Sequence, residues 1–182
     1  MKFLLPIIAL ISTLSACSHI EPNPLQEYLQ LAPSDTDLTQ NPRLQPFVKL
    51  YDNLDHGDLK TLVSDAYADK LYFNDTLVTL HDQPSLLLYL LRTQGHLDDI
   101  SCEILSILEQ NQNSFVRWRM RTQFTILGQQ KTVETIGISH LRFNAQGKIV
   151  LHQDYWDSMQ GFYLHIPVIG GVLQWLKNDL QD

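Results

Sequence analysis

The residues with the clearest chemical potential are His152, Asp154 and Trp156, near the end of the chain. They lie in a stretch, residues 148–157, that follows a turn signal at residues 144–147 and predicts a β-strand. Because side chains alternate along a strand, these three residues share one face with Val150. A buried carboxylate needs a partner, water or a chemical role. His152 and Asp154 therefore predict either an acid/base pair or a satisfied polar pair that fixes strand register.

A second carboxylate, Asp75, follows a short predicted strand, residues 71–74. In apolar surroundings its pKa would rise, which suits a general base. The alternative is a turn aspartate before Thr76 that accepts hydrogen bonds from backbone amides. The aromatic rings of Trp118 and Trp156 predict walls on which a ligand stacks, or alternatively simple core packing.

Composition excludes several functional classes. The chain has 182 residues, 44% of them hydrophobic, which suits one folded domain plus a targeting segment. Its formal net charge of -7 disfavours nucleic acid and polybasic membrane surfaces as partners. The histidines and acids lack a compact metal-ligand spacing, and no glycine-rich phosphate loop is present, so we expect neither a metal nor another cofactor.

The N-terminus predicts a lipoprotein signal. Lys2 precedes an apolar run, residues 3–14, that is too short to span a bilayer and ends in Leu14-Ser15-Ala16-Cys17. This sequence resembles the bacterial lipobox, which implies cleavage before Cys17 and a diacylglyceryl thioether on its sulfur. The alternative is an ordinary signal peptide with an incidental cysteine. Lipidation would leave Cys102 without a partner, so no intrachain disulfide is expected.

These features predict three regions: a signal peptide over residues 1–16, a flexible tether over 17–45, and a folded domain over 46–182. The tether is rich in proline. Ser18 follows the lipidation site, and by resemblance to Gram-negative sorting a residue other than Asp favours the outer membrane. We therefore expect an envelope lipoprotein that faces the periplasm, with the membrane as a partner through its lipid.

Within the domain, helical spacing and stop signals predict helices near residues 47–54, 58–69 and 84–95. Four longer strands follow, near residues 100–109, 114–126, 131–143 and 148–157. Helices first and an antiparallel meander afterwards predict an α+β fold with the helices on one sheet face. Three arginines alternate along the second long strand and predict a solvated outer face or a homodimer surface, with anion binding as the alternative: Arg117, Arg119 and Arg121.

The C-terminal tail is apolar and interrupted by Pro167 and by Gly170-Gly171 before a predicted helix over residues 172–177. We expect this tail to cap the open end of the sheet. A membrane-contacting amphipathic segment is the alternative and ranks second, because the tail carries few cations.

Three short motifs, Gly57-Asp58-Leu59, Tyr67-Ala68-Asp69 and Phe73-Asn74-Asp75, resemble the opening of the nuclear transport factor 2-like (NTF2-like) superfamily. Its ketosteroid isomerase and SnoaL-like branches are the most similar in pattern. The hairpin around residues 140–149 is similar too, and the resemblance covers residues 47–156. It implies a cystatin-like conical α+β barrel with a deep, mostly apolar pocket.

The same resemblance places Asp75 at the position of the isomerases' general base. It also places Leu50 where they have an oxyanion-hole tyrosine and Ser139 where they have a protonated aspartic acid. Loss of one oxyanion donor typically lowers the rate about 10²–10³-fold, so these departures disfavour steroid isomerisation. Tyr51 is one residue away, but one helical step turns about 100°, so it is not expected to substitute.

The resemblance makes His152, Asp154 and Trp156 inward-facing. The implied site comprises catalytic candidates (Asp75, His152, Asp154) and ligand-binding candidates (Trp118, Ser139, Trp156, Tyr72). Three functions follow from it. The first is binding of a small apolar or amphipathic molecule by a lipid-anchored domain. The second is a proton-transfer enzyme of the isomerase, dehydratase, cyclase or epoxide hydrolase type. The third is a structural envelope protein whose own tail fills the pocket.

Overall fold

A computed structural model describes residues 24–34, 41–166 and 168–179. The predicted signal segment, residues 1–16, and the predicted lipidation site, Cys17, lie outside the described residues. Among the described helices, none is both long enough and apolar enough to cross a membrane.

The helices lie close to where the sequence predicts them. Aspartates begin two of them, because the Asp58 carboxylate accepts from Thr61 N and Asp82 accepts from Ser85 N at 2.8 Å. Gly95 ends the third predicted helix, as expected. The bounds of the helices before the long strands are α1 Pro24–Leu31, the 3₁₀ helix η2 Pro42–Leu44, α2 Gln45–Asp52, α3 Leu59–Ala66 and α4 Gln83–Gln94.

Six strands form one curved sheet in the order β2-β1-β6-β5-β4-β3. Strands β1 and β6 pair in parallel, and the other neighbours are antiparallel. The predicted α+β class, with N-terminal helices packed on the sheet, is confirmed. The strand bounds are β1 Tyr67–Asn74, β2 Thr79–Asp82, β3 Asp99–Gln110, β4 Asn113–Ile126, β5 Gln129–Phe143 and β6 Ile149–Trp156.

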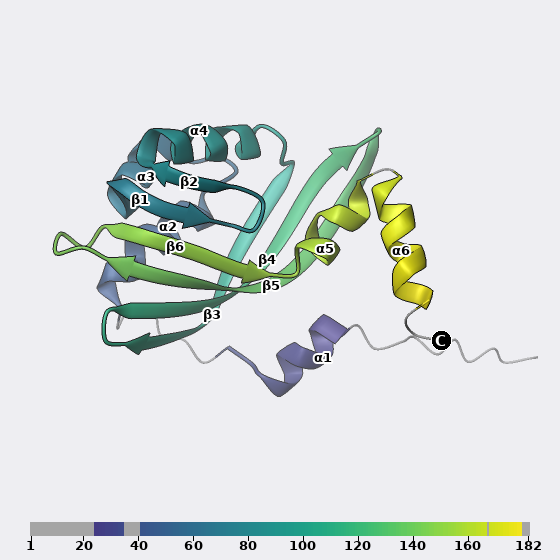
Figure 1. The fold of residues 1–182 in the computed structure, drawn as a ribbon, viewed down its shortest axis with the longest axis horizontal. Coiled ribbons are helices and arrows are strands. Elements are labelled where there is room, and N and C mark those ends of the chain that lie inside the picture. The colour runs from purple at the N-terminus through teal and green to yellow at the C-terminus, as the bar shows by residue number, and fades with distance from the viewer. Residues whose placement is uncertain (1–23, 35–40, 167, 180–182) are drawn as a thin grey trace, which may run out of the picture.

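The core lies between α2, α3 and α4 and the face of the sheet that curves around them (Figure 1). Strand β4 shows which face is inward, because Val116 and Trp118 are buried whereas Arg117 points to the opposite face. Helix α1 lies on that outer face and contacts the Arg117 guanidinium. The prediction of a tether for residues 17–45 includes residues outside the description and stays a prediction, but α1 within it packs on the domain.

The tail has two parts that behave differently. Asp157 caps α5, Ser158–Gly161, which packs on β5, and Gly161 touches the Trp156 ring so closely that a Cβ there would lie 2.3 Å from it. This helix covers part of β5 and precedes the segment, residues 162–177, that was expected to cap the sheet. The 3₁₀ helix η3, Tyr163–His165, and helix α6, Ile169–Asp179, follow. Helix α6 packs chiefly on η3 and leaves the sheet uncovered.

Candidate functional site

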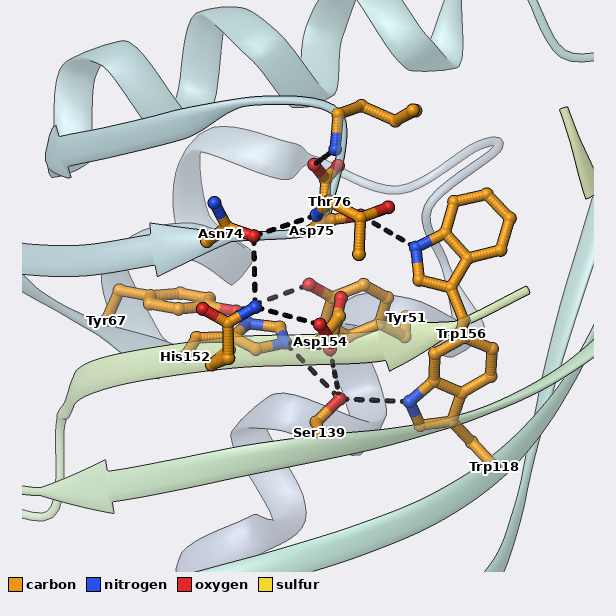
Figure 2. A network of polar contacts seen from close by, with 12 residues as sticks. Tyr51, Tyr67, Asn74, Asp75, Thr76, Trp118, Ser139, His152, Asp154 and Trp156 are labelled. Carbon is orange, nitrogen blue, oxygen red and sulfur yellow. Dashed lines mark hydrogen bonds and ion pairs between the residues drawn. The ribbon is translucent and has the colours of Figure 1, made fainter. Parts of the chain in front are cut away.

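Strand β6 points the predicted acid/base residues into the core. His152 is 0% exposed and Asp154 is 8% exposed, whereas Tyr155 on the opposite face is open to solvent. Sequence alternation grouped the two residues without choosing the inward face, and the structure supplies that choice. Figure 2 shows both side chains at the centre of a polar network that draws on α2, β1, β4, β5 and β6.

The Asp154 carboxylate is the acceptor at the centre of this network. Its Oδ1 accepts a hydrogen bond from Ser139 Oγ at 2.5 Å and lies 2.7 Å from His152 Nε2. Ser139 faces Asp154 directly across the β5–β6 pair, and its Oγ accepts from Trp118 Nε1 at 2.9 Å. The indole fits there because its neighbour on β5 is Gly137, where a Cβ would lie 2.2 Å from Trp118 Cζ2.

Two tyrosines continue the network on the other side of the imidazole. The Tyr67 hydroxyl lies 2.6 Å from His152 Nδ1, and the Tyr51 hydroxyl lies 3.3 Å from that of Tyr67. A carboxylate can only accept, so Nε2–H donates to Asp154. In the tautomer that carries its one proton on Nε2, Nδ1 accepts from the Tyr67 hydroxyl. Tyr51 then donates to Tyr67. Each hydrogen donated along this series of hydrogen bonds, from Tyr51 through Tyr67 and His152, therefore points toward Asp154 Oδ1.

Burial keeps the two tyrosines protonated. Loss of hydration raises the pKa of the Tyr51 hydroxyl well above its ordinary value of 10.0, with the nearby Tyr67 and Asp154 adding to the shift. Burial also raises the pKa of Tyr67, and the charge of Asp154 acts in the same direction. Both hydroxyls are therefore donors over the physiological pH range. Four aromatic rings surround the imidazole of His152, with centroids 5.0 to 6.0 Å away: Phe47, Tyr51, Tyr67 and Phe73.

The sequence argument that a 100° helical step keeps Tyr51 from replacing the oxyanion-hole tyrosine stays a prediction, but the Tyr51 hydroxyl does reach the network. Leu50 and Tyr51 are both buried, because the core covers α2 over more than one stripe. The long phenol side chain then carries its hydroxyl to Tyr67. Sequence reasoning missed Tyr67 as well. The available signal was that a tyrosine at a buried position requires a hydrogen-bond partner.

Asp75 has the contacts of a turn aspartate. Its Oδ1 accepts from the backbone N–H groups of Leu77 and Val78, each at 3.0 Å, and its Oδ2 accepts from the Tyr89 hydroxyl. Burial, with the charge of Asp75, raises the pKa of that hydroxyl, which stays a donor. These bonds hold the β1–β2 turn, where Thr76 has a φ of 76°. The chain thus supplies donors to both carboxylate oxygens, as the alternative interpretation expected.

The ligand-binding candidates do not all come together. Trp118 and Ser139 belong to the network, and Trp156 is next to it, donating from Nε1 to the Asp75 carbonyl at 2.7 Å (Figure 2). The prediction that Tyr72 lines the same site was wrong. Tyr72 is 37% exposed and bonds Gln153 on the outer face, because alternation along β1 turns Leu71 and Phe73 inward instead.

One polar atom of the site lacks a partner. Asp154 Oδ2 accepts no hydrogen bond from any residue that the structure describes, although the side chain is only 11% exposed. The donors on Oδ1 fix the orientation of the carboxylate. An oriented and mostly desolvated oxygen with a free lone pair can accept a hydrogen bond or a proton from a bound molecule.

Two clefts on the described part of the chain are lined by other residues. One, of about 710 Å³, lies between α2, α3 and the β5–β6 turn, and includes Lys49, Asp52 and Lys148. The other, of about 440 Å³, is lined by Leu25, Thr132, Val133, Glu134, Gln160 and His165. The imidazole of His152 is packed against side chains rather than open to either cleft. No group of His, Cys, Asp or Glu side chains in residues 24–34, 41–166 and 168–179 is arranged to hold a metal ion.

Solved structures with the same architecture come from several bacteria. An NTF2-like protein of unknown function from Exiguobacterium sp. 255-15 is 18% identical, with a TM-score of 0.55 over 63% of this chain and 98% of that one. A putative SnoaL-like polyketide cyclase from Shewanella denitrificans OS-217 is 14% identical, with a TM-score of 0.57 over 66% and 93%. An LEH-like epoxide hydrolase from M. tuberculosis is 17% identical, with a TM-score of 0.54 over 66% and 81%.

These identities show the fold alone, and the resemblance to the NTF2-like fold expected from the sequence is confirmed. Among curated proteins, no sequence is significantly similar to this chain. One family profile matches residues 47–152, which is more than half of the chain and includes Tyr51, Tyr67, Ser139 and His152. The chain therefore belongs to the family described as uncharacterized conserved protein (DUF2358), built on the NTF2-like fold.

Proposed function

We propose that this protein is a lipid-anchored component of the bacterial cell envelope whose NTF2-like domain binds a small amphipathic molecule. The observation that carries the proposal is the free Oδ2 of Asp154, a mostly buried oxygen oriented by Ser139 and His152. Such an oxygen is suited to a ligand hydroxyl or N–H group. Trp156 beside it offers an apolar surface, half-buried under Gly161 of α5. The ligand reaches Asp154 when α5 moves aside.

The similar structures support a small molecule as the ligand class. One of them carries the name of a putative polyketide cyclase and another that of an epoxide hydrolase, and both names refer to small organic substrates. The buried surroundings of Asp154 match such a ligand better than a macromolecule. A macromolecule would need an exposed surface, whereas Ser139 and His152 are almost fully buried.

Binding is tested with N-phenyl-1-naphthylamine, an apolar fluorophore with one N–H donor, on the purified full chain. Asp154→Asn and Asp75→Asn are matched variants, because each removes one carboxylate charge. We expect Asp154→Asn to weaken binding at least about tenfold, the equivalent of one lost charge-assisted hydrogen bond. Asp75→Asn is expected to leave affinity within about twofold. Equal affinities for the parent and both variants would contradict a ligand on Asp154.

The anchor is tested separately by metabolic labelling with a fatty-acid analogue. Cys17→Ala is expected to abolish incorporation of the label, and Cys102→Ala to retain it, because only Cys17 lies in the lipobox-like sequence. The lipid would anchor the domain, since acyl chains contribute about 0.8 kcal/mol per buried CH₂. Ser18 after the cysteine favours the periplasmic side of the outer membrane as its place. Incorporation that persists in Cys17→Ala would contradict this anchor.

A second candidate is a proton-transfer enzyme, favoured by the directed chain from Tyr51 through Tyr67 and His152 to Asp154. In this version Asp154 takes the proton at Oδ2, and His152 positions its carboxylate. Asp75 is unsuited to be the base, because the chain already donates to both of its oxygens. Hydrolysis of styrene oxide would test it. If the protein is an enzyme, Asp154→Asn should abolish turnover and Asp75→Asn should preserve it. Absence of turnover in the parent protein would rule out this reaction and leave ligand binding as the proposed function.

A further inference from the structure

Helix α6 exposes the largest concentration of apolar side chains on the described surface. Ile169, Val172 and Leu176 follow helical spacing along one stripe, Trp175 borders it, and all four are open to solvent. Trp175 is 65% exposed. Contiguous exposed apolar patches mark contact sites more often than scattered single residues do.

The domain holds the start of α6 and leaves the rest free. Gly170 packs so tightly that a Cβ there would lie 2.1 Å from the Leu164 carbonyl oxygen, which fixes the helix against η3. Beyond that point α6 extends away from the sheet (Figure 1). The described elements leave Val172 and Leu176 of this stripe exposed.

The opposite end of the described chain comes to the same side of the molecule. Arg117 donates to the Tyr28 hydroxyl at 3.0 Å and to the carbonyls of Ala32 and Pro33 at 3.2 and 3.0 Å, which holds α1 on the sheet. Near the start of α1, Leu25 lines one cleft together with His165 of η3. The chain therefore enters the domain beside the tail.

The predicted lipid lies a short way upstream of that point. Only residues 18–23 separate Cys17 from Pro24, and a fully extended chain of this length reaches about 25 Å at most. A lipid on Cys17 would therefore hold the start of α1 near the bilayer. The tail, whose His165 shares a cleft with Leu25 of α1, would be held near the bilayer with it.

We propose that the apolar face of α6 inserts into the interface of a phospholipid bilayer, as a second membrane contact beside the lipid on Cys17. This inference rests on the lipid anchor of the proposed function. The described helix carries one cation, Lys177, and one acid, Asp179. Its contact with the bilayer is therefore hydrophobic and does not depend on anionic lipid. Trp175 suits the interface, where indole rings concentrate.

The test uses the full lipidated chain in phosphatidylcholine vesicles, with the fluorophore NBD attached at Val172→Cys. The matched control is Leu108→Cys, an exposed apolar position by the β3–β4 turn, at the end of the sheet away from the tail. Burial raises the pKa of the Cys102 thiol to about 12, so labelling at neutral pH favours the introduced cysteine. The unlabelled parent measures any residual reaction.

We expect a blue-shifted emission at position 172 that nitroxides on the acyl chains quench at least twofold more than at position 108. High salt should leave this difference unchanged. Equal, water-like emission at both positions in a protein that floats with the vesicles would overturn the inference and leave the anchor standing. A protein that fails to float would overturn both. A signal lost in high salt would also overturn it, because the contact would then be electrostatic.

Discussion

The centre of the domain buries polar side chains, whereas its C-terminal helix exposes apolar ones. Each is the reverse of the usual distribution of side chains in a folded protein. His152 is 0% exposed among aromatic rings, whereas Trp175 is 65% exposed on α6. In the core, neighbours inside the chain satisfy the buried polar groups of His152, Tyr67 and Ser139. On α6, the described chain leaves most of the Trp175 side chain uncovered. Contacts within the fold thus account for the buried polar groups. The exposed apolar face of α6 points instead to a partner outside the fold.

This difference predicts where substitutions reduce stability. Removing a member of a satisfied buried network leaves its partners without hydrogen bonds, which costs more free energy than the lost bond contributed. Removing an exposed apolar side chain leaves the folded state almost unchanged. Four substitutions or conditions test the comparison, from the largest expected effect to the smallest.

The largest effect is expected for His152→Leu. It leaves Asp154 buried with only Ser139 as donor, and it leaves Tyr67 without its acceptor. Leaving buried groups without their hydrogen-bond partners typically costs about 1–3 kcal/mol each, and more when the group is a carboxylate. Urea unfolding of the two proteins measures this loss. His140→Leu is the control, because His140 bonds Asn113 on the outer face, and a cost below about 1 kcal/mol is expected there. Equal costs would mean that the network does not hold the core.

Gly137→Ala should follow. The new Cβ would lie 2.2 Å from Trp118 Cζ2, so the indole must shift away from Ser139. Overpacking of this kind costs about 1–3 kcal/mol. Thermal unfolding and the tryptophan emission spectrum would both change. Gly171→Ala in α6 is the matched control, since a Cβ added there would meet no atom within 4 Å. There we expect a gain of about 0.5–1 kcal/mol, and a loss equal to that at position 137 would contradict the comparison.

Alkaline pH should reduce stability through the buried tyrosines. Below pH 10 both the folded and the unfolded chain keep the phenol protons of Tyr51 and Tyr67, so these groups add no pH dependence. Above the ordinary pKa of 10.0 the unfolded chain releases them while the folded chain, with raised pKa values, retains them. Stability then falls by up to about 1.4 kcal/mol per pH unit for each group. Urea midpoints at pH 9 and pH 11 measure this slope. Tyr67→Phe should reduce it, and an unchanged slope would remove Tyr67 as a cause.

The smallest effect is expected for Trp175→Gln in the absence of lipid. The side chain is exposed and its helix packs chiefly on η3, so the free energy of unfolding should change by less than about 0.5 kcal/mol. Urea unfolding of the lipid-free chain measures it. Trp118→Phe provides the contrast, because it removes a buried donor to Ser139. A large decrease in the free energy of unfolding for Trp175→Gln would show that the domain covers α6 in solution.

Local patterns predicted most of the elements because alternation and capping act over a few residues. The four long strands fall within about two residues of their predicted ends. The helix begun by Asp58 was predicted to reach residue 69 but ends at Ala66, because residues 67–69 already belong to β1. Strand β2 was not predicted, because the four residues Thr79–Asp82 are too few for alternation to show. The parallel pairing of β1 with β6 was not predicted either, since nothing local encodes which distant strand is a neighbour.

The site was predictable only in its local part. Alternation grouped His152 with Asp154, but their donors Ser139 and Tyr67 are brought in by the sheet from other strands. The partners of Asp75 show the same limit. The turn amides are local and could be expected, whereas the Tyr89 hydroxyl comes from α4. Tyr72 was assigned to the wrong face of β1. The predicted strand had only four residues, too few to show which side chains point inward, and the strand is twice as long.

The parallel pairing of β1 with β6 also determines when the domain can fold. Tyr67 and His152 are 85 positions apart, so their contact cannot form until most of the chain has been synthesised. Contacts over such separations slow folding, because a long loop must close before they stabilise anything. The N-terminal helices therefore cannot complete their packing until strand β6 is available. In a chain that begins with an export signal, as the sequence predicts, this delay keeps the polypeptide unfolded and able to thread through a translocation pore.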